Sequence, residues 1–327
     1  MSIREIVVIS GKGGTGKTTL AAALAASAGG RAVIADADVD APNLALLLHP
    51  RETARIPFTG MAVAHVNEGL CTGCGLCEAN CRYNTIHVRD GKARVDEGFC
   101  EGCRVCLHVC PEKCISLKSF ERGNIRRGDT DLGPLWHGRL YPGGENTGLM
   151  VARLRKEARR EAEESGAPLL ITDGPPGIGC PVTSSVTGAS FALLVTEPSL
   201  SALSDLRRAA ELCRILGTPF GVVVNRWTLS EELTALIKDT CAGEGWPLMA
   251  LIPFDERIAL SVGAGRIPSE EMKEELAELW SAIYRTGRFQ NDGNRNCIGR
   301  EGRGVNGGGP FRQGALVYHC GRGWQYS

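Results

Sequence analysis

Hydrophobic positions near the N-terminus predict a strand, a helix and a second strand, in that order. Residues Glu5–Ser10 form a short β-branched run, which is typical of a strand that is buried on both faces. Lys17–Ala28 is rich in alanine and stops at Gly29 and Gly30, so it is predicted to be a helix. Arg31–Asp36 is the next apolar run. This order predicts a βαβ unit and therefore a parallel sheet.

The alternation of strands and helices stops near Arg51 and resumes near Met150. Further strands are predicted at 168–173, 191–196, 219–225 and 247–252. Helices are predicted at 151–165, 203–216, 231–241 and 270–284. The pattern therefore predicts an α/β fold, with a mostly parallel sheet, helices on both of its faces and an insertion between residues 51 and 150.

The last predicted helix has one apolar face, and two interpretations of it are possible. The residues that share this face are Met272, Leu276, Leu279, Trp280 and Ile283. A stripe of this kind is more typical of a helix packed on a core than of a helix that docks on a membrane. We therefore expect this face to be buried in the protein.

Composition narrows the function classes. With 327 residues, of which 43% are hydrophobic, the chain is predicted to hold about two domains. Lys+Arg and Asp+Glu number 37 each, so no overall charge favours binding to nucleic acid. No apolar run approaches the ~20 residues of a membrane-spanning helix, and the N-terminal apolar stretch leads into a glycine loop rather than a signal cleavage site. We therefore expect a cytoplasmic protein without a membrane span or a nucleic-acid partner.

The C-terminal segment differs from the rest of the chain. Residues 288–327 contain ten glycines, and six arginines against two acidic residues. Such a composition buries little apolar surface, so a flexible Gly/Arg-rich tail is predicted.

The glycine loop after the first strand carries a phosphate-binding motif. Residues 11–18 fit G-x-x-x-x-G-K-[ST] and lie between a predicted strand and a predicted helix, which is the context that the motif needs. Lys17 is expected to reach the β- and γ-phosphates of a nucleotide, and the Thr18 hydroxyl to bind Mg²⁺. The predicted nucleotide-binding residues of the loop are Gly11, Gly13, Gly14, Thr15, Gly16, Lys17, Thr18 and Thr19.

A second lysine, Lys12, makes the loop resemble the deviant Walker A motif of the MinD/ParA superfamily of P-loop ATPases. The resemblance implies ATP with Mg²⁺ as ligand, and a homodimer or closely related heterodimer in which Lys12 reaches the partner's nucleotide. It also implies that Asp38 positions the attacking water and that Asp173 holds the Mg²⁺ shell. Asn225 resembles the residue that reads the adenine edge, although a turn residue at the end of a strand is an equally good interpretation.

Eight of the fourteen cysteines lie between residues 71 and 110, in two runs with the spacing C-x2-C-x2-C-x3-C. In bacterial two-cluster ferredoxins, three cysteines of one run and the fourth cysteine of the other run hold each cluster. The predicted ligands are Cys71, Cys74, Cys77 and Cys110 for one [4Fe–4S] cluster, and Cys100, Cys103, Cys106 and Cys81 for the other.

Three features of the cysteine pattern leave alternatives open. Zinc also binds C-x2-C pairs, but eight cysteines without histidine spacing favour clusters. Arg82 stands where the ferredoxin pattern usually has proline, which removes no ligand. Cys114 and Cys180 are expected to be packed side chains, although Cys180 lies near the place where the nitrogenase iron protein, a member of the same superfamily, holds a cluster.

Together these motifs resemble MinD-superfamily ATPases with an inserted ferredoxin-like α+β domain. The predicted division is an NTPase domain at 1–57 and 119–287, the insertion at 58–118, and the tail at 288–327. The leading hypothesis is a dimeric ATP-hydrolysing switch that couples nucleotide state to electron delivery, or to metallocluster maturation, of a redox or metalloenzyme partner. The alternatives are a MinD/ParA-like positioning ATPase with structural clusters and, less favoured, an amidotransferase-like ligase.

Overall fold

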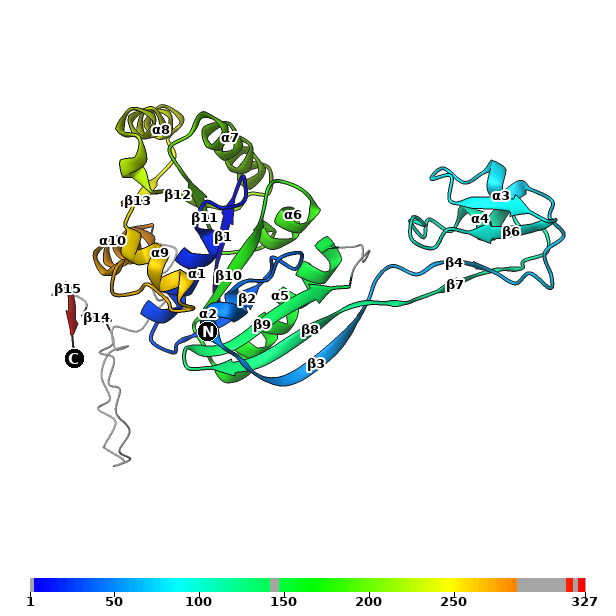
Figure 1. Ribbon diagram of the computed structural model, residues 1–327, viewed down its shortest axis with the longest axis horizontal. Helices are drawn as coiled ribbons and strands as arrows, with labels where there is room; N and C mark the ends of the chain where they lie inside the picture. Colours follow the sequence, from blue (N-terminus) through cyan, green and yellow to red (C-terminus); the bar gives the residue numbers. More distant parts are fainter. Residues whose placement is uncertain (1–2, 142–146, 287–315, 320–322, 327) are drawn as a thin grey trace.

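The computed structural model describes residues 3–141, 147–286, 316–319 and 323–326, and a nine-stranded sheet forms its centre (Figure 1). In spatial order its strands are β13 (Leu248–Ile252), β12 (Phe220–Asn225), β11 (Phe191–Thr196), β1 (Arg4–Ser10), β10 (Leu169–Pro176), β2 (Ala32–Asp36), β9 (Gly133–Leu140), β8 (Glu121–Thr130) and β3 (Arg51–Thr59). All neighbours from β13 to β9 pair in parallel, whereas β9, β8 and β3 pair antiparallel. The predicted α/β fold with a mostly parallel sheet is confirmed.

Helices cover both faces of this sheet (Figure 1). One face packs against α1 (Lys17–Ser27), α2 (Leu44–Leu48), α9 (Glu256–Gly263) and α10 (Lys273–Arg285). The other face packs against α5 (Thr147–Ser165), α6 (Cys180–Val186), α7 (Leu200–Ile215) and α8 (Glu231–Glu244), and a 3₁₀ turn, η1 (Trp227–Leu229), precedes α8. Alternate residues of β1 serve the two faces, because Ile6 and Val8 join one core and Val7 and Ile9 the other.

The apolar face of α10 is buried, as predicted. Met272, Leu276, Leu279, Trp280 and Ile283 are each at most 2% exposed and belong to the core beside α1. The membrane-docking interpretation of this face is therefore wrong. None of the helices in the described part of the chain is both long and apolar enough to cross a membrane.

Within the central sheet, the sequence pattern missed three strands, β3, β8 and β9. The sequence of β3 is Arg-Glu-Thr-Ala-Arg-Ile-Pro-Phe-Thr, and most of its residues are exposed. This strand lies at the edge of the sheet, where polar side chains and a proline are tolerated. The sheet therefore extends beyond the apolar runs from which it was predicted.

A small lobe, which we define as residues 60–120, extends from this edge of the sheet (Figure 1). Strands β3 and β8 lead into β4 (Val63–Val66) and β7 (Ile115–Lys118), which pair antiparallel and form an arm (Figure 1). The far end of the lobe holds α3 (Leu76–Ala79), α4 (Val105–Val109) and a second pair of strands, β5 (Ile86–Arg89) and β6 (Lys92–Val95). The lobe has its own apolar cluster, separate from those of the sheet.

Part of the predicted flexible tail has regular structure. β14 (Leu316–His319) and β15 (Gly323–Tyr326) pair antiparallel, which differs from the expected tail without structure. Both segments carry aromatic residues, and β14 also carries a β-branched valine, residue types that favour strand pairing even within a glycine-rich sequence. The rest of the predicted tail lies outside the described residues, as do Cys297 and Cys320.

Candidate functional sites

The predicted phosphate loop lies between β1 and α1, with its backbone bent by glycines. Gly14 and Gly16 have φ angles of 82° and 90°, in the left-handed region that other residues rarely adopt. Gly16 immediately precedes α1, and a Cβ atom there would lie 2.3 Å from Nδ2 of Asn225. That same amide donates a hydrogen bond to the carbonyl of Thr15 over 2.8 Å. Asn225, the last residue of β12, thus holds the loop from the side.

Lys17 lies among the carboxylates predicted to act with it. Its Nζ atom is 2.9 Å from Oδ2 of Asp38 and 3.6 Å from Oδ1 of Asp173. Asp173 belongs to β10, and Asp38 follows β2, so the carboxyl ends of neighbouring parallel strands bring both acids to the loop. Asp36 lies beneath them, fully buried, and accepts hydrogen bonds from the amides of Leu44 and Asp38.

The acidic groups at this site outnumber the basic one, and their closeness shifts the pKa values of both kinds. Burial by itself would lower the pKa of Lys17, but Asp173 and Asp38 raise it above its ordinary value. Burial raises the pKa of Asp173 to about 6, and Lys17 opposes this shift. Burial, together with the charge of Asp173, also holds the pKa of Asp36 well above its usual range. Three carboxyl groups therefore surround one ammonium group.

Asp173 is the least satisfied member of this group. Neither of its carboxyl oxygens accepts a hydrogen bond from the residues that the structure describes, although both are buried, and the hydroxyl of Thr15 also lacks a partner among them. Thr18 lies close to Asp173. Buried carboxylate oxygens that accept no hydrogen bond are costly, and a hard divalent cation prefers oxygen ligands of this type. Asp173 and Thr18 therefore fit a Mg²⁺ ion.

Lys12 faces the other side of the loop and is held within its own chain. Its Nζ atom lies 2.7 Å from Oε1 of Glu197 and 3.2 Å from Oγ of Ser199. Arg226 contacts the same glutamate over 3.4 Å and the carbonyl of Gly14 over 3.2 Å. We define this Lys12–Glu197 pair, with its serine and arginine neighbours, as the Lys12 latch.

Sequence reasoning did not assign a role to Glu197 or Arg226. The available signal was their position, since each is a charged residue that follows directly after the last residues of a buried strand. In a parallel sheet such positions meet at one edge, which is the edge where the phosphate loop lies.

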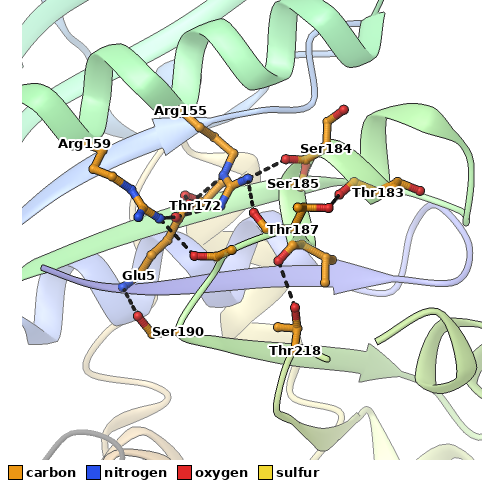
Figure 2. Close-up of polar contacts among 12 residues, drawn as sticks. Glu5, Arg155, Arg159, Thr172, Thr183, Ser184, Ser185, Thr187, Ser190 and Thr218 are labelled. Atoms are coloured by element: carbon orange, nitrogen blue, oxygen red, sulfur yellow. Dashed lines mark hydrogen bonds and ion pairs between the residues drawn. The ribbon is translucent and has the colours of Figure 1, made fainter. Parts of the chain in front are cut away.

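A buried polar network joins β1, α5 and α6 (Figure 2). Glu5 is fully buried in β1, and its carboxylate accepts hydrogen bonds from Arg155 Nε and Nη2, both over 2.7 Å. Arg159 and the hydroxyl of Thr172 also donate to it. The remaining Nη1 of Arg155 donates to the carbonyls of Ser184 and Thr187 at the end of α6.

This network was also missed by sequence reasoning. The clue in the sequence was Glu5, the single acidic residue in an otherwise apolar run. An acidic residue buried in this way requires a cationic partner. α6 follows the loop after Asp173, and α5 follows β9, on the side of the sheet that carries the arm. The Arg155 guanidinium of α5 therefore connects α5 to the segment after Asp173.

The predicted cluster ligands surround two cavities in the small lobe. The first cavity is lined by five cysteines together with the loop around Gly73, and the second cavity by four. Cysteines of the first cavity are Cys71, Cys74, Cys77, Cys110 and Cys114; those of the second are Cys81, Cys100, Cys103 and Cys106. Each cavity thus brings together the four cysteines predicted for one cluster, taken from both runs.

The two cavities repeat one local design. Each C-x2-C-x2-C loop leads into a short helix whose preceding residue has a left-handed backbone, Gly75 before α3 and Arg104 before α4. Backbone amides approach sulfur atoms in both, from Ala93 to Cys71 and from Thr85 to Cys81, each over 3.4 Å. The bond from Ala93 is the first cause that lowers the pKa of Cys71, whereas burial raises the pKa of Cys106 to about 11.

The expectation of a packed side chain holds for one of two other cysteines and fails for the second. Cys114 is buried, as predicted, but it lines the first cavity and its sulfur lies 3.4 Å from that of Cys110. Cys180, expected to be a buried apolar side chain, is exposed; that prediction was wrong because α6 begins at this residue, on the surface. Among the residues described, no three cysteine, histidine or acidic side chains are placed to hold a metal ion.

Comparison with known proteins identifies relatives of this chain. Uncharacterized protein MJ0578 of Methanocaldococcus jannaschii is 31% identical over 226 residues, which cover 68% of this chain and 78% of that protein. The chloroplastic septum site-determining protein minD homolog of Arabidopsis thaliana is 27% identical over 270 residues, covering 80% and 67% of the two chains.

The fold is shared with a solved structure. The septum site-determining protein MinD of Pyrococcus horikoshii, complexed with Mg-ADP, superposes with a TM-score of 0.51 at 19% identity, covering 88% of this chain and 98% of that one. The family described as the CobQ/CobB/MinD/ParA nucleotide binding domain matches residues 6–268, which include the phosphate loop, Asp173 and Asn225. This protein therefore belongs to the CobQ/CobB/MinD/ParA nucleotide-binding family.

Proposed function

We propose that this protein is an ATP-hydrolysing dimeric switch that holds two [4Fe–4S] clusters and couples its nucleotide state to electron delivery, or to metallocluster maturation, of a partner protein. The observation that carries this proposal is the arrangement of cysteines around two cavities, on an arm that continues two strands of the nucleotide-binding sheet. The family itself supports only the nucleotide-binding part.

At the nucleotide site, this chain's own residues would do the following. The backbone amides of residues 11–18 bind the phosphates, and Lys17 exchanges its contacts with Asp38 and Asp173 for the β- and γ-phosphates. Asp38, released from Lys17, then orients a water molecule for attack. Thr18 and Asp173 would hold Mg²⁺, which supplies charge neutralisation of the phosphates.

Lys12 has a separate task in this proposal. To reach the nucleotide of a second subunit it must first leave Glu197, which now binds it over 2.7 Å. Dimer closure would therefore begin with opening of the Lys12 latch. A side chain 30% exposed can do so at small cost, because pairs of this exposure contribute only about 0.2–1 kcal/mol.

The two cavities fit [4Fe–4S] clusters better than zinc ions. A tetrahedral zinc site places its sulfur ligands about 2.3 Å from one ion, so they must meet at a single point. Among the described residues, no three cysteine, histidine or acidic side chains converge closely enough to hold one metal ion, and no histidine lines either cavity. Amides directed at sulfur are also typical of iron–sulfur sites. A bound cluster would supply one-electron transfer.

We further propose a route by which the two ends of the molecule affect each other. The arm continues β3 and β8, β8 pairs with β9, and α5 follows β9. Arg155 of α5 binds the carbonyls at the end of α6, which follows the loop after Asp173. Movement of that loop on hydrolysis would thus be transmitted through α6, α5, β9 and β8 to the base of the arm.

A second candidate function is a positioning ATPase in which the clusters are structural. A specific observation favours it, since several relatives are septum site-determining MinD proteins. The comparisons support this candidate more directly than the redox role, because a relationship to MinD requires only the nucleotide site.

One experiment separates these functions. Protein purified without oxygen is assayed for iron, acid-labile sulfide and EPR signals, and its ATPase rate is measured with clusters oxidised and with clusters reduced by dithionite. A redox switch predicts iron-loaded protein whose ATPase rate depends on cluster state. ATP-dependent filaments with a rate unaffected by reduction would favour the positioning ATPase, and colourless zinc-loaded protein would end the cluster proposal.

Within the redox switch, the fate of the cluster separates electron delivery from maturation. Iron and sulfide are measured before and after ATP hydrolysis in the presence of an apo-ferredoxin acceptor. Electron delivery predicts that both clusters stay on this chain, whereas a maturation role predicts their loss to the acceptor in step with hydrolysis.

A further inference from the structure

We propose that Cys114 is a fifth cysteine of the first cavity and can replace Cys110 as a cluster ligand. This inference rests on the proposed presence of clusters. Cys114 is 5% exposed and lies against the cavity, with its sulfur 3.4 Å from that of Cys110. It also interacts with Cys71, so it sits between two of the four ligands predicted for this cavity.

The second cavity provides an internal comparison. Cys114 follows Cys110 by four residues, and in the other run Thr85 follows Cys81 by the same number. The Thr85 hydroxyl lies 3.4 Å from the Cys81 sulfur, just as the Cys114 sulfur lies 3.4 Å from that of Cys110. The repeat therefore places a side chain beside the fourth ligand in both cavities, but only the first cavity has a thiol there.

A thiol and a hydroxyl differ in what they can do at this position. Iron–sulfur clusters are held by thiolates, which are soft ligands, whereas a threonine hydroxyl is a hard and weakly acidic group. Cys114 can therefore take the place of Cys110, while Thr85 can only hydrogen-bond to Cys81. The asymmetry gives the first cluster two possible ligand sets and the second cluster one.

The exchange balances without an outside reagent. The bond between the Cys110 sulfur and iron breaks, a bond between the Cys114 sulfur and iron forms, and the proton of the Cys114 thiol passes to the Cys110 sulfur. No electron is gained or lost. The 3.4 Å separation lets this proton pass directly between the two sulfurs.

The position of Cys114 in the chain gives the exchange a consequence. Cys110 directly follows α4, whereas Cys114 immediately precedes β7, and the Cys114 carbonyl accepts a hydrogen bond from the Asn67 amide over 2.8 Å. Asn67 follows β4, so Cys114 is anchored to both strands of the arm. Ligation by Cys114 would connect the first cluster directly to the arm, and ligation by Cys110 would connect it through α4.

The test compares the two cavities by iron and sulfide content of protein prepared without oxygen. Cys110→Ala should keep nearly all the iron of the wild type, because Cys114 takes over, whereas Cys81→Ala should keep about half. Cys110→Ala combined with Cys114→Ala should fall to about half. Adding Thr85→Cys to Cys81→Ala should restore the iron, since it recreates the fifth thiol in the second cavity.

Cys114→Ala alone should keep both clusters, and ATP binding of every variant checks that the sheet is folded. If Cys110→Ala loses half of its iron, as Cys81→Ala does, Cys114 is not a replacement ligand, although the cluster proposal still stands. If the wild type contains neither iron nor sulfide, the cluster proposal fails first, and this inference with it.

Discussion

The sheet and the small lobe bury their functional residues in different ways. In the sheet, three apolar clusters built from aliphatic and aromatic side chains hold β1, β2 and β10 in place, and the phosphate loop is simply the end of that framework. In the lobe, four of the nine buried residues in its apolar cluster are cysteines, Cys71, Cys77, Cys106 and Cys114.

This difference teaches where each site obtains its stability. The nucleotide site is preorganised by a core that exists without ligand, so losing the nucleotide leaves the sheet folded. The lobe is too small for a large core of its own, and in the proposed cluster-bound form its cysteines would be both core residues and ligands. We therefore expect the lobe to depend on its clusters as small metal domains do, and the sheet to be independent of them.

The strongest test of this contrast is removal of the clusters. Chelation of iron under oxidising conditions should unfold residues 60–120 while the sheet stays folded, because only the core of the lobe includes cysteines proposed to hold the clusters. Hydrogen exchange with mass spectrometry should show lost protection in β4–β7 and unchanged protection in β1 and β10. Equal protection of β4–β7 with and without iron would show that the lobe folds by itself.

The converse test removes a nucleotide contact. Lys17→Ala should lower ATP affinity by about 10²–10⁴, since two charge-assisted contacts of about 1.5–3 kcal/mol each are lost. Iron and sulfide content should not change. Calorimetric titration with ATP and Mg²⁺ measures the affinity, and Cys81→Ala is the matched control that should lose iron and keep ATP binding.

A third test addresses the buried network in Figure 2. Arg155→Ala should reduce the free energy of unfolding of the sheet by about 3–5 kcal/mol, because it leaves the Glu5 carboxylate buried without its main partner. Urea denaturation followed by tryptophan fluorescence measures this. Arg159, which is 40% exposed, offers the control, and Arg159→Ala should cost clearly less. Equal effects of the two substitutions would show that Arg155 is not the main partner of the Glu5 carboxylate.

The smallest expected effect concerns the Lys12 latch. Glu197→Gln should strengthen ATP-dependent dimerisation by about 1.4- to 5-fold, corresponding to the ~0.2–1 kcal/mol of a partly exposed ion pair. Lys12→Ala should instead abolish that dimerisation while ATP still binds. Sedimentation with and without ATP measures both. Weaker dimerisation of Glu197→Gln would mean that Glu197 supports the closed state rather than restraining Lys12.

The sequence predicted most of the sheet because its central strands are continuous apolar runs, as in β1 and β11. It failed for β3, whose position at the edge of the sheet permits polar residues. It also failed for β8 and β9, which lie inside the sheet but mix polar with apolar residues instead of forming continuous apolar runs. α5 begins at Thr147, earlier than the predicted Val151, and Gly148, a poor helix former, obscures its first turn in the sequence.

The grouping of residues in space was predictable where a motif occupies a short segment. The phosphate loop and the two cysteine runs are motifs of this kind, and the structure brings their residues together. Glu5, Arg155 and Glu197 were not predicted, because their partners lie 150 residues or more away in the chain and only the folded sheet brings them into contact. The thiol pair of Cys110 and Cys114 likewise required coordinates, since spacing alone does not show which cavity a surplus cysteine faces.

The arm has a mechanical consequence. Residues 115–122 comprise β7, the two residues after it and the start of β8, and they precede Gly123, the first residue of β8 in register with β9. At about 3.3 Å per extended residue, these eight residues form a lever of roughly 26 Å. A rotation of about 10° at the pivot beside Gly123 would move the tip of the lever by roughly 5 Å. A rotation too small to disturb the sheet would therefore displace both cavities by more than the width of a water molecule.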